Sequence, residues 1–212
     1  IVTHNGNFHA DEVFAIATLL LYGERGSHAE WHASEVDIVR TRESAVIETG
    51  DIVVDVGGIY DESSNRFDHH QIGGAGERSN GIPYASFGLV WKKYGKAVCG
   101  NDEKVAFFVE RKLVMPIDGA DNGLDMYEPV IKDVKPYTLY DLFQSYTASL
   151  KEETDLDTIF SRVVKIAYDI LVREIKRSND TVVAKHELEA AYATSKDKHI
   201  IVLAKRYASE TL

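Results

Sequence analysis

The residues best suited to chemistry form the run Arg-Phe-Asp-His-His-Gln at positions 66–71. An aspartate followed by two histidines fits neither a core strand nor a solvated helix face. Carboxylates and imidazoles are metal ligands, and a carboxylate beside an imidazole commonly orients that ring. Taken alone, the triplet at Asp68, His69 and His70 is better explained as a His-rich surface turn. A metal-site interpretation therefore depends on further clusters elsewhere in the chain.

Three such clusters follow apolar runs. The first holds His4, His9 and Asp11, directly after the apolar start of the chain. The second is Asp55, which lies in the run Val-Val-Asp-Val-Gly-Gly at 53–58, where a buried carboxylate would need compensation. The third is Ile-Asp-Gly-Ala-Asp-Asn-Gly at 117–123, which supplies two late aspartates. Carboxylates and imidazoles thus recur at four separate places.

The elements that must position these clusters alternate between strands and helices. Early strands separated by helices predict an α/β fold with a mostly parallel sheet and helices on both faces. In such sheets ligands bind at the carboxyl ends of the strands, which would bring the clusters to one edge. We expect strands at residues 1–3, 36–41, 51–56, 65–67 and 200–203. We expect helices at 11–22, 86–94, 102–115, 138–146, 155–177 and 182–192, with Asp11 capping the first, Gly95 and Pro116 ending the second and third, and a break at 179–180.

So many carboxylates cannot converge without strong repulsion unless cations neutralise them. Two divalent ions that share Asp55 would do so, and we expect an Asp55→Asn change to relieve repulsion and raise the stability of the metal-free protein. Mixed imidazole and carboxylate ligation favours Mn²⁺, with Mg²⁺, Zn²⁺ and Co²⁺ as rivals. Such a pair of ions performs hydrolysis, usually at phosphorus.

The bulk properties set wider limits. A length of 212 residues predicts one main domain with a partial second. The formal net charge of −10 argues against a broad basic surface for duplex DNA. The single cysteine, Cys99, fits a reducing compartment, and no apolar run reaches membrane-spanning length. We therefore expect no membrane partner and an intracellular, by default cytoplasmic, location, with nuclear and mitochondrial locations open.

The four motifs, in this order, resemble the DHH phosphoesterase superfamily, and within it most closely the MYG1 (UPF0160) family. The N-terminal motif of that resemblance is Thr-His-Asn-Gly-Asn-Phe-His-Ala-Asp-Glu at residues 3–12. The resemblance implies a DHH-type catalytic domain and metal-dependent phosphodiester hydrolysis, with 3′-to-5′ RNA exonuclease activity in eukaryotic members. It also implies a catalytic domain over residues 1–178, and a linker helix with an incomplete second, substrate-gripping lobe over 179–212.

The resemblance also implies roles for individual residues. One metal site would hold His4, His9 and Asp55, and the other would share Asp55. His70 would face the substrate, with Asp68 orienting it. His-Ala-Asp stands at 9–11 where the superfamily commonly has Asp-x-Asp, which makes the first site richer in nitrogen. The second site would contain Asp11, Asp55, His69 and a late aspartate, either Asp121, which we favour, or Asp118.

The glycine-rich loop at 72–83 leaves its role open. Backbone N–H groups at Gly74 and Gly76 could cradle a phosphate, or the loop could be a lid or a plain linker. Arg78 is the candidate phosphate contact within it. The expected substrate is RNA or a short oligonucleotide. Two alternatives remain: a phosphatase or pyrophosphatase of a small phosphorylated metabolite, and a metal-binding module without turnover. The oligomeric state is left open.

Overall fold

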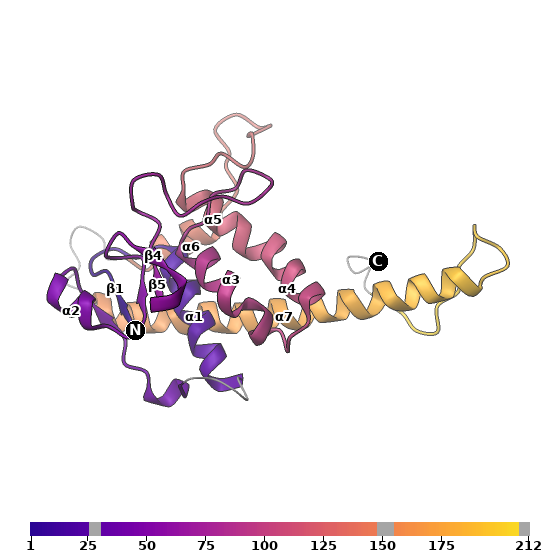
Figure 1. Ribbon diagram of the computed structural model, residues 1–212. Coiled ribbons are helices and arrows are strands. Elements are labelled where there is room, and N and C mark those ends of the chain that lie inside the picture. The colour runs from indigo at the N-terminus through magenta and orange to yellow at the C-terminus, as the bar shows by residue number, and fades with distance from the viewer. Residues whose placement is uncertain (26–30, 148–154, 208–212) are drawn as a thin grey trace.

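A mostly parallel five-stranded sheet lies at the centre of the computed structural model, which describes residues 1–25, 31–147 and 155–207 (Figure 1). The strand order is β2-β1-β3-β5-β4. β1, β2, β3 and β5 run parallel, and β4 pairs antiparallel with β5 at one edge. The predicted α/β class is confirmed. The strands are β1 (Val2–Thr3), β2 (Val39–Arg40), β3 (Val53–Val54), β4 (Tyr60–Asp61) and β5 (Arg66–Phe67).

Helices cover both faces of this sheet, as expected. Successive strand residues point to opposite faces. Val53 therefore packs with Val46 and Ile47 of α2 (Ser44–Thr49) on one side. Val54 and Phe67 point to the other side and join the main hydrophobic core. Two short 3₁₀ turns, η1 (Ala33–Glu35) and η2 (Glu62–Ser64), lie in the connections.

The main core is organised around α1 (Ala10–Arg25), which contacts α3 (Ser86–Val98) on one side and α7 (Leu156–Thr194) on the other. α1 is apolar on nearly all its faces and is buried along most of its length, as expected for a helix enclosed by others. Phe14 of α1 stacks on Phe87 of α3 with ring centroids 5.3 Å apart. This packing fixes the start of α3 against α1, which matters for the site.

Two predicted helix ends are wrong. α3 passes Gly95 and ends at Val98, because Gly95 packs against Trp91, where an added Cβ would lie 2.6 Å from the indole ring. Pro116 does not end the third helix either. α4 (Glu103–Val109) continues through the π-helical turn η3 (Glu110–Val114) into α5 (Met115–Asp121). Pro116 lies directly after the π-helical turn η3, where the regular i→i−4 bonding of the α-helix is interrupted, so a residue without an N–H can be accommodated there.

The C-terminal predictions are also partly wrong. α6 (Leu139–Gln144) forms as expected, with Thr138 and Asp141 in a capping box. The predicted break at 179–180 is absent: α7 is one helix of 39 residues, and Val182 and Ala184 extend its buried stripe. The predicted strand at 200–203 does not form within the described residues 195–207. A strand needs a hydrogen-bonding neighbour, and none of the described segments pairs with it. The proposed division at 178/179 stays a prediction.

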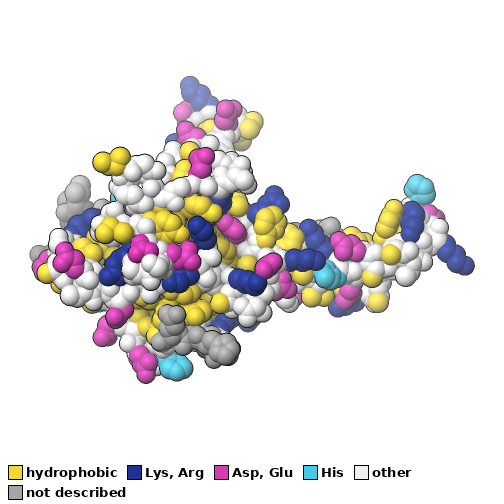
Figure 2. Space-filling view, in the orientation of Figure 1, with side chains coloured by type: hydrophobic (Ala, Val, Ile, Leu, Met, Phe, Trp, Pro, Cys, Tyr) yellow, Lys and Arg dark blue, Asp and Glu magenta, His cyan; other side chains and the backbone are white. Residues whose placement is uncertain are grey.

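The second half of α7 extends beyond the body of the molecule (Figure 1). On the face shown in Figure 2, Lys and Arg side chains are interspersed with Asp and Glu. Among the described helices, none combines the length and the apolar character needed to cross a membrane.

Candidate metal centre

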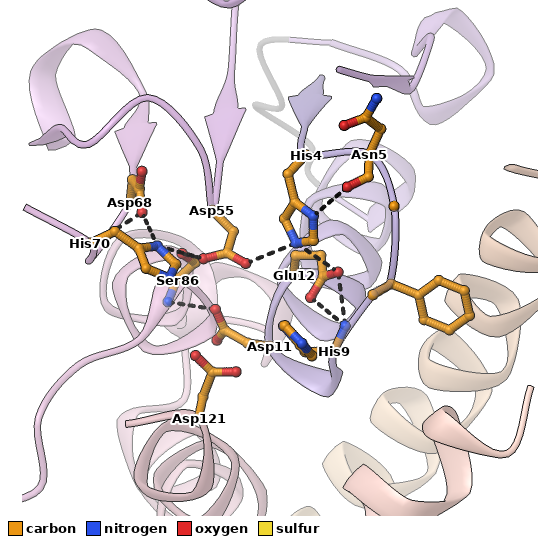
Figure 3. Close-up of polar contacts among 12 residues, drawn as sticks. His4, Asn5, His9, Asp11, Glu12, Asp55, Asp68, His70, Ser86 and Asp121 are labelled. Carbon is orange, nitrogen blue, oxygen red and sulfur yellow. Dashed lines mark hydrogen bonds and ion pairs between the residues drawn. The ribbon is translucent and has the colours of Figure 1, made fainter. Parts of the chain in front are cut away.

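The carboxyl ends of three neighbouring parallel strands bring the predicted residues together. His4 follows β1, Asp55 follows β3, and Asp68 follows β5, each as the next residue along the chain. Their side chains converge in Figure 3 with those of Asp11 and Asp121, which come from α1 and α5. The parallel sheet thus gathers residues that are more than sixty positions apart in the sequence.

Asp55 lies at the middle of this cluster, and its side chain is 2% exposed. One carboxylate oxygen, Oδ2, lies 3.3 Å from Nε2 of His4. The other, Oδ1, lies 3.4 Å from Nε2 of His69 and accepts a hydrogen bond of 3.2 Å from the Ser86 hydroxyl. Asp55 has a left-handed backbone conformation, with φ of 57°. Each oxygen therefore faces a different imidazole, which is the arrangement that a bridging carboxylate requires.

The first group that could hold a metal contains His4, His9, Glu12 and Asp55, whose ligand atoms all lie within 4.8 Å of one another. Glu12 is fully buried and lies 3.2 Å from Nε2 of His4. It also accepts the backbone N–H of His9 at 2.9 Å. The sequence interpretation did not place Glu12 among the ligands. The spacing of His9 and Glu12 is that of a capping box. This spacing is the sequence feature that could have drawn attention to Glu12.

A second group contains Asp11, His69 and Asp121. Nε2 of His69 lies 3.1 Å from Oδ2 of Asp121. Asp11 does not cap its own helix, contrary to expectation, because it lies inside the first turn of α1. Its two oxygens instead accept the backbone N–H groups of Ser86, at 2.9 Å, and Phe87, at 2.7 Å. Asp11 thus joins the metal centre to the N-terminus of α3.

His70 differs from His69 in both exposure and partners, although it shares a third potential group with Asp55 and His69. Its side chain is 60% exposed, whereas that of His69 is 7% exposed. Asp68 holds the ring through a contact of 2.7 Å between Oδ1 and Nδ1, and also accepts the backbone N–H of Gly58. Because Nδ1 is held by Asp68 and the side chain is largely exposed, Nε2 is the ring nitrogen left for a substrate.

The protonation of the cluster follows from these contacts. Burial lowers the pKa of His4, but hydrogen bonds with Asp55 and Glu12 outweigh burial and raise it to about 10. Burial likewise opposes protonation of His69, yet the close carboxylates of Asp121 and Asp55 raise its pKa to about 11. These imidazolium groups hold the pKa of Asp55 below its ordinary value despite burial. Two protons thus balance the buried carboxylates when no cation is bound.

Repulsion among the carboxylates affects the pKa of Asp11. Burial raises its pKa well above the ordinary value, and the neighbouring Asp121 and Asp55 raise it further. Nε2 of His69 is buried and has no hydrogen-bond partner of good geometry, although two carboxylates lie near it. A buried polar atom without a hydrogen bond is costly, and a cation among these donors would satisfy it. The donor set therefore fits one or two divalent ions.

Arg78 is placed differently from the expected phosphate contact. Its side chain is 5% exposed, and it pairs with Asp118 and Glu110 at 2.8 Å each while lying over the ring of Tyr84. Asp118 also accepts the backbone N–H of Gly88 at 2.9 Å. A phosphate contact by Arg78 stays a prediction, and this structure does not favour it, because the guanidinium is buried and ion-paired with two carboxylates. Asp118 belongs to this pair rather than to the groups that could hold a metal, which include Asp121.

The glycine-rich loop is exposed over most of its length. Gly74 donates its N–H to the carbonyl of Gln71 at 2.9 Å, so this amide is used within the loop and is not free to cradle a phosphate. Gly76 accepts a hydrogen bond from the N–H of Tyr84 through its carbonyl, and a phosphate contact by its own amide stays a prediction.

A cavity of about 490 Å³ opens onto the cluster. The strand-end residues are among those that line it, so a ligand in it would meet candidate metal ligands directly. It is lined by His4, Asn5, Asn7, His9, Arg42, Asp55, Val56, Gly57, Gly58, Asp68 and His70.

Comparison with known proteins identifies the family of the chain. The model of an uncharacterised protein family, UPF0160 (MYG1), matches residues 1–212, the whole chain. The chain belongs to this family. The resemblance inferred from the four motifs is thereby confirmed at the family level.

Several relatives carry the MYG1 name. The MYG1 protein of Caenorhabditis elegans is 33% identical over 193 residues, which cover 83% of this chain and 54% of the relative. The human protein named MYG1 exonuclease is 33% identical over 144 residues, covering 60% of this chain and 36% of its own length. The chain thus spans about half the length, or less, of these relatives. No solved structure matches the chain.

Proposed function

We propose that this chain carries the catalytic residues of a two-metal phosphodiester hydrolase that acts on RNA or short oligonucleotides, with 3′-to-5′ exonuclease polarity. The observation that carries the proposal is the position of Asp55 between His4 and His69, which makes it common to two potential metal groups. Relatives named MYG1 exonuclease support a nuclease or phosphoesterase function. The placement in the wider DHH superfamily belongs to the same proposal.

The proposed ligands divide into two sets that share Asp55. A bound pair of divalent ions would supply an activated water nucleophile and neutralise charge on the phosphoryl oxygens. The mixture of imidazole and carboxylate donors favours Mn²⁺ over Ca²⁺, whose sites consist almost entirely of oxygen ligands. Mg²⁺, Zn²⁺ and Co²⁺ are rivals. One set is His4, His9, Glu12 and Asp55. The other joins Asp11, His69 and Asp121 with Asp55, whose Oδ1 lies 3.4 Å from Nε2 of His69.

His70 has the proposed role of stabilising charge on the substrate. The hydrogen bond with Asp68 raises the pKa of His70 above its ordinary value, which favours the protonated ring. With Nδ1 held by Asp68, Nε2 can donate a hydrogen bond to a phosphoryl oxygen as negative charge develops there. Asp68 thus acts through His70, by fixing the orientation of the ring.

The test compares two neighbouring histidines. His69→Ala removes a proposed ligand, so bound Mn²⁺ and hydrolysis of a labelled oligoribonucleotide should fall together. His70→Ala should keep wild-type metal content while turnover falls on the order of 10²–10³-fold, the range seen when one such donor is removed. Metal content after loading and desalting, together with initial rates, separates the two. Equal loss of metal from both variants would refute the division of roles, and a wild type without more than one equivalent of metal would refute the two-metal site.

A second candidate is hydrolysis of a small phosphorylated metabolite or pyrophosphate. The net charge of −10 and the cavity of about 490 Å³ favour it, because a small ligand needs no extended basic surface. Turnover of metal-loaded protein against a panel of RNA, DNA, dinucleotides and pyrophosphate decides between the two candidates. Metal binding without any turnover in the panel would instead identify a metal-binding module.

A further inference from the structure

One arginine beside the metal centre has no role in the function proposed so far. Arg42 is the one Lys or Arg among the described residues that line the cavity. It is exposed, and no ion pair of Arg42 occurs in the part of the chain that the structure describes. Arg78, which sequence reasoning favoured as the phosphate contact, is buried and paired with Asp118 and Glu110. Arg42 is therefore the guanidinium that a ligand in the cavity can reach.

The backbone that carries Arg42 is firmly held. The N–H of Thr41 donates to the carbonyl of Thr3 at 2.8 Å, which places Arg42 beside the His4 end of β1. Arg40 is 3% exposed in its side chain and anchors the end of β2, because it pairs with Asp157 at 2.8 Å and bonds the carbonyl of Gly6. The two arginines thus differ: Arg40 has a buried side chain and binds protein partners through Nη1 and Nη2, and Arg42 is open to the cavity.

The strand order places Arg42 and His70 at opposite ends of the site. His70 follows β5, Arg42 follows β2, and β1 and β3 lie between them. With neighbouring strands about 4.8 Å apart, β2 and β5 are separated by about 14 Å. The candidate metal ligands at the ends of β1 and β3 occupy the middle of this span. A phosphate held by those ligands would therefore lie between His70 and Arg42.

We propose that Arg42 binds the phosphate that flanks the scissile one in the substrate, an inference that rests on the proposed phosphodiester hydrolysis. A guanidinium forms two parallel hydrogen bonds with phosphate oxygens, a geometry that a lysine ammonium cannot reproduce. The substrate class that satisfies both positions is an oligonucleotide with at least two consecutive phosphates. A dinucleoside monophosphate, which has a single phosphate, leaves Arg42 without a partner.

The experiment compares a trinucleotide containing two phosphodiesters with a dinucleoside monophosphate, using Mn²⁺-loaded protein. Wild type should prefer the trinucleotide in both equilibrium binding and kcat/KM. Arg42→Gln should lower kcat/KM for the trinucleotide on the order of 10- to 100-fold, mainly through KM, because a non-reacting phosphate contributes uniform binding. The dinucleoside rate should stay near wild type. Arg42→Lys should recover part of the loss. Arg111→Gln, which removes another exposed charge outside the cavity, should retain wild-type values.

The possible failures are distinguishable. If the trinucleotide is hydrolysed and Arg42→Gln keeps the wild-type preference, the Arg42 contact is refuted and the proposed function stands. Equal losses on both substrates would also refute it, since they would place Arg42 at the scissile phosphate or in the fold. If neither substrate is hydrolysed but the trinucleotide binds more tightly through Arg42, the contact stands and hydrolysis fails. Wild-type melting temperature and metal content in Arg42→Gln are expected, because the side chain is exposed.

Discussion

Replacing Asp55 by Asn tests whether this carboxylate holds two protonated imidazoles together. Sequence reasoning alone predicts that the change relieves repulsion and stabilises the metal-free protein. The structure reverses this expectation, because Asp55 lies between His4 and His69, whose pKa values are raised. Asn is a suitable probe because it tolerates the left-handed backbone conformation of Asp55, whereas Ala would add strain of about 1–2 kcal/mol.

The magnitude follows from the two contacts. At 3.3 and 3.4 Å they are longer than ideal charge-assisted hydrogen bonds of about 2.8 Å. Charge-assisted contacts contribute about 1.5–3 kcal/mol each, and the lower value suits ion pairs of these lengths. The free energy of unfolding should therefore fall by about 3 kcal/mol at pH 7 without metal. For a chain of this size that corresponds to a drop of about 6–12 °C in melting temperature.

Urea unfolding in the presence of EDTA measures this difference, and its pH dependence provides a second check. A histidine with a raised pKa stabilises the folded state fully below its ordinary pKa of 6.5, and this contribution is lost as pH rises through the folded value. The gap between wild type and Asp55→Asn should thus narrow as pH approaches about 10, where His4 loses its proton. Asp133→Asn is the matched control, since Asp133 is exposed and shares the left-handed conformation, with φ of 62°. A metal-free Asp55→Asn protein as stable as wild type at pH 7 would refute the reasoning.

Two further predictions concern metal uptake and packing. Mn²⁺ binding near pH 7 should release up to two protons, because the two buried imidazoles, with pKa values of about 10 and 11, must lose them. Calorimetry in buffers of different ionisation enthalpy counts the released protons. Zero release would contradict the assignment. Gly88→Ala should lower the free energy of unfolding by about 3 kcal/mol or more, since the added Cβ would lie 1.9 Å from Asp118 and disrupt a buried ion pair. Gly119→Ala, whose Cβ meets only the flexible Met126 side chain, should cost far less in the same urea titration.

The gathering of the site could be predicted from the sequence. Residues that follow strands in a parallel sheet share one edge, so His4, Asp55 and His69 were expected together, and they are. The sequence favoured Asp121 over Asp118 but did not decide between them, because both lie in one turn-like sequence. The structure separates them by their partners, Arg78 for Asp118 and His69 for Asp121.

Other features depended on tertiary partners that sequence patterns do not reveal. An arginine in a glycine-rich loop, such as Arg78, is typical of an exposed phosphate contact. In the structure, however, its guanidinium is buried and contacts Glu110. Glu12 was hidden because a glutamate in a helix is usually solvated, and only the packing around α1 buries it. The continuity of α7 past residue 179 likewise comes from long-range packing of its stripe, which local polarity does not show.

The bonds between Asp11 and the start of α3 have a consequence for how readily the site accepts a cation. Because Ser86 and Phe87 each hold one carboxylate oxygen, the side chain of Asp11 is immobilised before any ligand arrives. The rotamer entropy of this donor has therefore been lost during folding rather than during binding. Association is correspondingly less costly, as for any receptor that is rigid in its bound form. An uncharged residue in its place would loosen the first turn of α3, and the ligands would then have to be ordered when the cation binds.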